Sequence, residues 1–279
     1  MADDLVFAAS PLWPTAYSDV NAAIRDLLTS IQVVLDAELC GMYLVGSLAL
    51  GDFDPQKSDL DLMIVTFDTL SEETVASLRE LHQHFDDSAS PWAKRVDAVY
   101  IPQIILREPF PPAARYPVVE WPKLLALEAL ESGWPIQRFT MRNCGIIVSG
   151  PDPHSLLDPV HPDDLRQASV AIVERWQAQA HGDPEWPAWL REQGNHTFVV
   201  LTLCRLLYTL ETGSVASKPA AAHWVETVLT SRWSGLIRRA RGELHTREDA
   251  PEDEVNETLA LLEYTYERYQ QWRASSTTR

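Results

Sequence analysis

The segment between residues 43 and 65 constrains this chain more than any other, because it joins two apolar runs through a short polar stretch. It reads Tyr-Leu-Val-Gly-Ser-Leu-Ala-Leu-Gly-Asp-Phe-Asp-Pro-Gln-Lys-Ser-Asp-Leu-Asp-Leu-Met-Ile-Val. The pattern predicts an apolar strand, a turn at Gly46 and Ser47, and a second apolar strand that opens with Asp59 and Asp61. Residues i and i+2 of a strand point to the same face, so we expect the two carboxylates to lie side by side.

Two like charges held this close repel each other, and a bound cation offsets that cost. Magnesium suits such a pair, because it takes one or two protein carboxylates and completes its octahedron with water and substrate phosphates. The neighbouring turn at Gly46 and Ser47 offers backbone N–H groups and a hydroxyl to phosphate oxygens. The segment therefore predicts a site for a metal-bound nucleoside triphosphate.

A third acid stands inside the apolar run that reads Arg-Val-Asp-Ala-Val-Tyr-Ile from residue 95 to residue 101. An unpaired carboxylate within a sheet is costly, so Asp97 needs a partner. A metal ion or a substrate hydroxyl near Asp59 and Asp61 would serve. The alternative is an ion pair between Asp97 and either Arg95 or Lys94.

The first half of the chain alternates helical and strand patterns, which is typical of a mixed α/β sheet. Residues 102–122 contain six prolines, so we expect a surface loop there that borders a substrate cleft. Ser18 is the expected cap of the first helix, and residues 69–72 resemble a capping box. The expected elements are a helix at 17–37, strands at 39–45 and 60–67, a helix at 69–86, a strand at 95–101, a helix at 123–132 and a strand at 145–148.

Beyond residue 162 the apolar spacing is helical throughout, and prolines between 151 and 162 mark a boundary. Asn195 is the expected cap of a strongly apolar helix that Gly213 ends. Including this helix, we expect a bundle of about five. The predicted fold class is α+β, with a sheet domain over residues 1–158 and an all-α domain over residues 159–279.

Composition excludes several function classes. Lysine and arginine total 23 against 40 acidic residues, for a formal charge of −17, which disfavours nucleic acid and anionic membranes as partners. No apolar run approaches the ~20 residues of a membrane span, and the acidic start is unlike a secretory signal. The three cysteines lie far apart and read as small core residues. We expect a monomeric protein of the cytoplasm.

The motif at 43–65 and the acid at Asp97 are similar to those of the nucleotidyltransferase superfamily. Further stretches resemble the aminoglycoside (3″)(9) adenylyltransferases, and the similarity spans nearly the whole chain. These stretches are Arg115-Tyr-Pro117, Gly150-Pro151, Asp158-Pro-Val160, Leu201-Thr-Leu-Cys-Arg205, Glu211-Thr-Gly213, Lys218 and Ala222-His-Trp224. The resemblance implies a sheet domain that presents three carboxylates to one or two Mg²⁺ ions. It also implies a helical domain and transfer of AMP from ATP to a hydroxyl of streptomycin or spectinomycin.

The resemblance assigns roles residue by residue. For the nucleotide it implies phosphate contacts from the turn at Gly46 and from the side chains of Ser47, Ser58, Arg205 and Lys218. For the metal it implies Asp59 and Asp61, joined by Asp97, which also takes the place of the catalytic base.

Two positions depart from the family pattern. The catalytic base is usually a glutamate, so Asp97 is one methylene shorter. Asn195 stands where the helical domain usually offers an aspartate to a cationic drug, and it brings no charge. Trp121 matches a tryptophan that stacks on the drug.

We therefore expect a Mg²⁺-dependent enzyme that uses ATP as co-substrate and modifies a small cationic or polyhydroxylated molecule. Two alternatives keep parts of this interpretation. One changes the acceptor to a protein side chain, and the other is a catalytically silent nucleotide-binding module.

Overall fold

The computed structural model describes residues 13–110, 114–130, 132–242 and 249–276, and it divides into two compact units. The sheet unit contains residues 13–49, 58–129 and 141–158. The helical unit contains residues 159–276 together with two segments from the first half, 50–57 and 130–140. The predicted α+β class, with a mixed sheet followed by helices, is confirmed.

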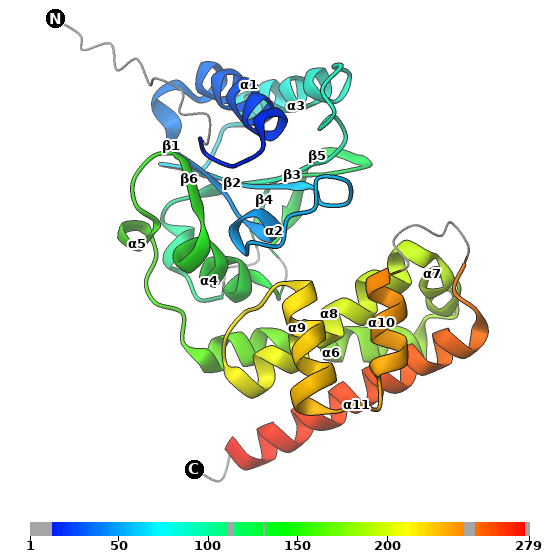
Figure 1. Ribbon diagram of the computed structural model, residues 1–279. Helices are drawn as coiled ribbons and strands as arrows, with labels where there is room; N and C mark the ends of the chain where they lie inside the picture. The colour runs from blue at the N-terminus through cyan, green and yellow to red at the C-terminus, as the bar shows by residue number, and fades with distance from the viewer. Residues whose placement is uncertain (1–12, 111–113, 131, 243–248, 277–279) are drawn as a thin grey trace, which may run out of the picture. The chain divides into compact units, whose positions relative to one another are not determined.

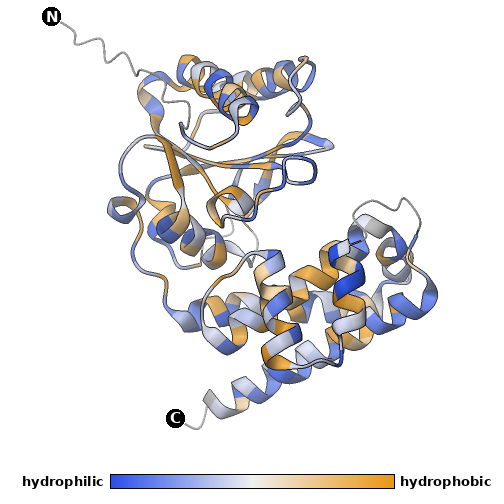
Figure 2. Cartoon of the chain, in the orientation of Figure 1, coloured by the Kyte–Doolittle hydropathy of each residue, from blue (hydrophilic) through white to orange (hydrophobic). Residues whose placement is uncertain are grey.

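The sheet unit is built on six strands in the order β5-β4-β3-β2-β1-β6 (Figure 1). β2 and β3 run parallel, and the other neighbouring pairs are antiparallel. Hydrophobic residues concentrate along the central strands (Figure 2). The bounds are β1 Leu39–Leu44, β2 Leu60–Thr66, β3 Val96–Pro102, β4 Arg115–Glu120, β5 Lys123–Ala129 and β6 Ile146–Ser149.

Helices α1 (Ser18–Leu35) and α3 (Glu72–Asp86) cover one face of this sheet (Figure 1). The expected cap at Ser18 is wrong, because Ser18 is already the first helical residue and Tyr17 precedes it without a side-chain cap. The α3 cap is also displaced from the expected position. Ser71 accepts a hydrogen bond from the Thr74 N–H at 3.1 Å, which satisfies one free donor of the first turn.

The segment after β3 differs most from the prediction. The expected loop at 102–122 contains strand β4, and the expected helix at 123–132 is strand β5. The leucines, alanines, lysine and glutamate of β5 favour a helix, but pairing with β4 overrides that propensity. Pro117 is tolerated because β4 pairs with β3 only through Val118 and Val119. A helix that the sequence did not indicate, α4, follows at Trp134–Cys144.

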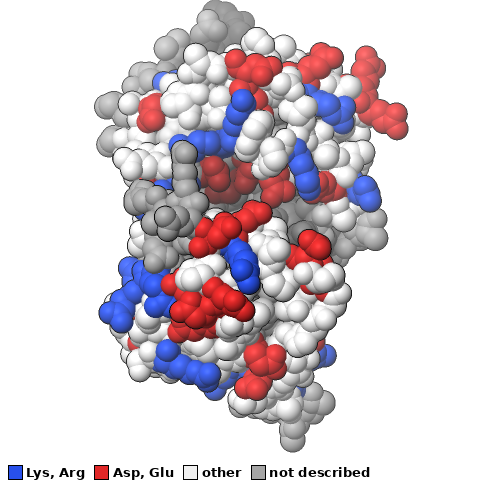
Figure 3. All heavy atoms as spheres, turned by 90° about the vertical axis from the view of Figure 1, so that its right-hand side faces the viewer, with Lys and Arg blue, Asp and Glu red and all other residues white. Residues whose placement is uncertain are grey.

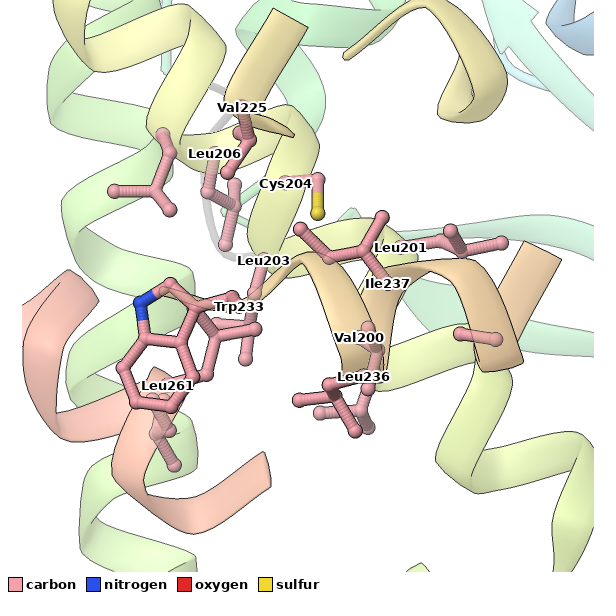
Figure 4. Packing of buried hydrophobic residues seen from close by; sticks show 14 of the residues in the cluster. Val200, Leu201, Leu203, Cys204, Leu206, Val225, Trp233, Leu236, Ile237 and Leu261 are labelled. Atoms are coloured by element: carbon pink, nitrogen blue, oxygen red, sulfur yellow. The ribbon is translucent and has the colours of Figure 1, made fainter. Parts of the chain in front are cut away.

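The helical unit buries a continuous apolar core around α8 (Gln193–Thr212). Its side chains pack with those of α10 and α11, and Trp233 fills the space between them (Figure 4). Gly213 ends α8 in the left-handed conformation, as predicted. The expected cap at Asn195 is wrong, because α8 begins two residues earlier. The other helices are α6 Pro162–Gly182, α7 Trp186–Arg191, α9 Lys218–Trp224 with a π-helical extension Val225–Leu229, α10 Ser234–Gly242 and α11 Glu252–Ser276.

Short elements complete the description. These are α2 Gly46–Ala49, α5 Pro153–Leu156 and the 3₁₀ turns Asp36–Glu38 and Ile105–Arg107. The three cysteines are free thiols. Within the described ranges, no helix combines the length and hydrophobicity needed to cross a bilayer.

A buried polar pair joins α3 to β3. His82 Nε2 and Tyr100 Oη share a hydrogen bond of 2.8 Å, and burial lowers the pKa of His82 to about 4, so the ring is neutral. We expect Tyr100→Phe to cost about 1–3 kcal/mol, because it leaves a buried ring nitrogen unsatisfied. Urea unfolding measures this. The double variant His82→Phe/Tyr100→Phe should recover part of the loss, and equal stability of Tyr100→Phe and wild type would contradict the prediction.

Candidate active site

The turn between β1 and β2 is shaped by contact with an acid. Gly46 has φ +57°, and a Cβ atom placed on it would lie 1.8 Å from a carboxylate oxygen of Asp61. Only glycine leaves room for that carboxylate while adopting this left-handed backbone without strain. The Val45 N–H donates to the Asp61 carbonyl at 2.9 Å, which fixes the turn against β2. The glycine predicted from the sequence as a phosphate contact is therefore also what lets Asp61 approach the turn.

The hydroxyl of Ser47 is buried and has no hydrogen-bond partner among the described residues. A buried hydroxyl without a partner loses the hydrogen bonds that water would have made, and a bound ligand can restore them. Ser58, the second predicted serine contact, precedes β2, and its carbonyl accepts a hydrogen bond from the Arg95 guanidinium. The two serines thus flank the excursion between the strands.

The three predicted carboxylates come together on one part of the sheet. Asp61 and Asp97 are direct partners in the parallel β2–β3 register, so their side chains share a face. Burial and the neighbouring carboxylates, Asp61 first, then Asp59 and Glu120, raise the pKa of Asp97 to about 7. The Trp121 backbone N–H donates to Asp97 and opposes this shift.

Asp59 is the outer member of the group, with a side chain 52% exposed and 3.7 Å from Arg95 Nε. The alternative that Arg95 or Lys94 pairs with Asp97 is not what the structure shows. Arg95 pairs with Asp59 and stacks over Trp92, whereas the Lys94 ammonium lies over the Trp121 ring. Asp97 therefore faces acids and a backbone N–H.

The donor set suits a hard cation that keeps most of its other ligands. In the described ranges no three histidine, cysteine or acidic side chains are grouped closely enough to enclose a metal by themselves. Mg²⁺ requires less than this, because one or two carboxylates suffice when substrate phosphates supply further oxygens. Asp59 and Asp61 fit that requirement, and the turn that Asp61 contacts at Gly46 also carries the unpartnered hydroxyl of Ser47.

The remaining predicted residues are distributed over both units. Trp121 follows β4 in the sheet unit and is 46% exposed. Arg205 lies on α8 and Lys218 begins α9, where its ammonium stands 4.9 Å from the centre of the Phe198 ring. Asn195 is tied to its own helix end, because its amide donates to the Trp189 carbonyl and to Glu192.

One acid near Asp97 was missed by the sequence reasoning. Glu120 ends β4 and contributes to the raised pKa of Asp97. The sequence contains no signal for it, because the prolines before it predict a loop and the pairing of β4 with β3 is a tertiary event.

Acidic and basic side chains are intermixed on the face of the molecule that Figure 3 displays.

Two family models match this chain, one in the sheet-forming first half and one in the helical second half. Residues 35–117 match the nucleotidyltransferase domain, and residues 155–268 match the C-terminal domain of aminoglycoside adenylyltransferase. The first match covers β1 to the middle of β4, including the three carboxylates. The second covers α8, Arg205 and Lys218.

Individual relatives extend over most of the chain. An aminoglycoside (3″)(9) adenylyltransferase of Shigella flexneri is 25% identical over 88% of this chain and 94% of its own length. A spectinomycin 9-adenylyltransferase of Campylobacter jejuni is 25% identical, covering 86% and 92%. Among solved structures, a spectinomycin adenyltransferase from Enterococcus faecialis, crystallised with ATP and spectinomycin, superposes with a TM-score of 0.67. It is 20% identical and covers 89% of this chain and 98% of that one.

The mixed sheet, its paired acids and the serine-bearing turn define a nucleotidyltransferase. The chain also contains a match to the C-terminal domain of aminoglycoside adenylyltransferase. Over most of its length it is similar to aminoglycoside (3″)(9) and spectinomycin 9-adenylyltransferases.

The contact between Gly46 and Asp61 can be tested by substitution. We expect Gly46→Ala to lower stability by roughly 1–3 kcal/mol, because it combines backbone strain with displacement of the Asp61 carboxylate. Gly51→Ala is the matched control, since its φ is +78° but nothing lies within 4 Å of the added Cβ. Thermal unfolding should show the larger loss for Gly46→Ala, reduced in an Asp61→Ala background. Equal losses for the two alanines would show that the contact carries no cost.

The raised pKa of Asp97 predicts a pH-dependent cost in the metal-free protein. An unfolded aspartate has a pKa near 3.9, against about 7 when folded. Between about pH 4 and pH 7 the folded state therefore binds more protons, and the contribution of Asp97 to stability falls as pH rises. In EDTA, Asp97→Asn should match wild type near pH 4 and exceed its melting temperature near pH 8. A difference that does not change with pH would refute this.

Proposed function

We propose that this protein transfers AMP from ATP to a hydroxyl group of a small aminoglycoside or aminocyclitol, such as streptomycin or spectinomycin. The observation that supports this best is the row of Asp61 and Asp97 on neighbouring strands, with Asp61 against the Gly46 turn that carries the buried unpartnered hydroxyl of Ser47. Similarity to the C-terminal domain of aminoglycoside adenylyltransferase and to adenylyltransferases over most of the chain supports AMP as the transferred group.

In this proposal the sheet unit binds the triphosphate. The Ser47 hydroxyl gains a partner in a phosphate oxygen, and the Gly46 turn keeps its backbone close to the phosphates. Ser58 contacts a second phosphate oxygen. Asp59 and Asp61 would hold Mg²⁺, which supplies charge neutralisation of the triphosphate when it is bound.

Asp97 is proposed as the catalytic base. It takes the proton from the acceptor hydroxyl, and the oxygen forms a bond to the α-phosphorus of ATP as the bond to pyrophosphate breaks. Its pKa of about 7 supports this role, because a base is most effective when its pKa lies near the working pH. The Trp121 N–H holds the carboxylate in place.

The helical unit completes the proposal. Arg205 and Lys218 would stabilise the negative charge on the leaving pyrophosphate. Trp121 would stack on the acceptor and Asn195 would hydrogen-bond to one of its hydroxyls. We further propose that the functional domains are residues 1–158 and 159–279, and that the protein acts as a monomer in the cytoplasm.

The activity can be tested by measuring pyrophosphate release from ATP and Mg²⁺ with streptomycin, spectinomycin and neutral polyols. We expect Asp97→Ala to lower kcat about 10²–10⁴-fold while ATP binding, measured by calorimetry, stays within a few-fold of wild type. Asp26→Ala, an exposed aspartate on α1, is the control and should keep full activity. Release that no acceptor stimulates would rule out the proposed transfer, and an unchanged rate for Asp97→Ala would remove Asp97 as the base.

A further inference from the structure

The row of acids extends across a third strand. β3 and β4 pair antiparallel through Ala98 with Val119 and Val99 with Val118. Continuing this register by one pair sets Asp97 opposite Glu120, and both residues lie within their strands. Directly opposed residues of an antiparallel pair point to the same face, with Cβ atoms about 5 Å apart. Asp61, Asp97 and Glu120 therefore follow one another across β2, β3 and β4.

Glu120 lies at the end of this row that is farther from the Gly46 turn. Asp61 borders the Gly46 turn, where the proposed function places the triphosphate, and Glu120 lies on the other side of Asp97. A group that approaches Asp97 from the side away from the nucleotide meets Glu120. We expect the acceptor hydroxyl to approach Asp97 from this side, because the triphosphate of the proposed function occupies the other.

The Glu120 carboxylate forms no ion pair with the lysines and arginines that the structure describes. Among the described residues, no lysine or arginine nitrogen lies within 4 Å of its carboxylate. Lys123, its cross-strand partner on β5, pairs instead with Glu128 at 3.3 Å. The negative charge at this end of the row is therefore not balanced by a neighbouring ion pair.

The residue after Glu120 already holds a cation. The Trp121 ring is 46% exposed, and the Lys94 ammonium lies 5.1 Å from its centre. The face of an indole ring attracts a cation through its quadrupole. Lys94 thus shows what kind of group this ring accepts, and it is an exposed side chain that can leave.

We propose that Glu120 and the ring of Trp121 form a binding position for one ammonium or guanidinium group of the acceptor. The Lys94 ammonium occupies the aromatic half of this position until the acceptor displaces it. The inference rests on the proposed function for the identity of the acceptor. It supplies, from the sheet unit, the negative charge that Asn195 does not bring.

The two halves of the proposal predict opposite effects. Glu120→Gln removes the charge that attracts the acceptor, so we expect its dissociation constant to rise about five- to tenfold. Lys94→Gln removes an internal competitor, so we expect that constant to fall about two- to fivefold. The affinity for ATP should change in neither variant, because both residues lie on the acceptor side of Asp97.

The experiment follows the Trp121 indole N–H signal by NMR, assigned with Trp121→Phe. Streptomycin, spectinomycin and neutral myo-inositol are titrated into the full-length protein. Glu80→Gln, at an exposed acid on α3, and Arg115→Gln are the matched controls. They make the same charge changes within the sheet unit and leave the pair of Lys123 with Glu128 intact. Wild type and both controls should bind streptomycin or spectinomycin alike, and myo-inositol should not move the signal.

The same readout separates this inference from the proposed function, because it requires no turnover. If AMP transfer fails with every acceptor but a cationic probe still moves the Trp121 signal in a Glu120-dependent way, the proposed function is wrong and the cation position stands. If Glu120→Gln binds both cationic probes as tightly as Glu80→Gln does, the inference is overturned. The same holds if neither probe moves the signal in wild type.

Discussion

The parallel register of β2 and β3 is the constraint on which the rest of the site depends. It sets Asp61 beside Asp97 on one face, within strands whose other residues are mostly buried. A slip by one residue would turn one carboxylate to the opposite face and destroy the pair. The hydrophobic burial of the two strands therefore holds together two charges that repel each other. Burial first, and then this repulsion, raises the pKa of Asp97.

The residues around Asp97 do not relieve the electrostatic repulsion between the two carboxylates. Arg95, the nearest basic residue in sequence, pairs with Asp59 at the exposed end, and Lys94 lies over Trp121. Among the described residues, Asp97 receives a hydrogen bond from the Trp121 backbone N–H alone. A carboxylate neutralised by an internal lysine or arginine would be a poorer base and a poorer ligand. The same arrangement that weakens the metal-free fold suits the site to cationic ligands, which agrees with the match to the nucleotidyltransferase domain.

Prediction from sequence succeeded where local pattern and tertiary context agree. The two strands of the 43–65 segment and the helical spacing of α8, with its glycine stop, were read correctly. The expected turn at Gly46 and Ser47 is a short helix, and Asp59 lies just before the second strand. It failed at β5, where a run of good helix formers becomes a strand because β4 offers a partner. That error also concealed Glu120, since a residue placed in a loop has no cross-strand neighbour. The interpretation of Asn195 as a cap failed by three residues, because Glu192 is the residue that precedes α8.

The sequence alone determined which chemistry the chain can perform, because the i, i+2 spacing of Asp59 and Asp61 and the nearby glycine and serine act within a few residues. It also determined that the second half is helical. Only the tertiary structure decided which acids become neighbours, since Asp61, Asp97 and Glu120 come from strands separated by long intervening segments. Strand pairing is set by the free energy of burying whole faces of a sheet, and no short window of sequence contains that information.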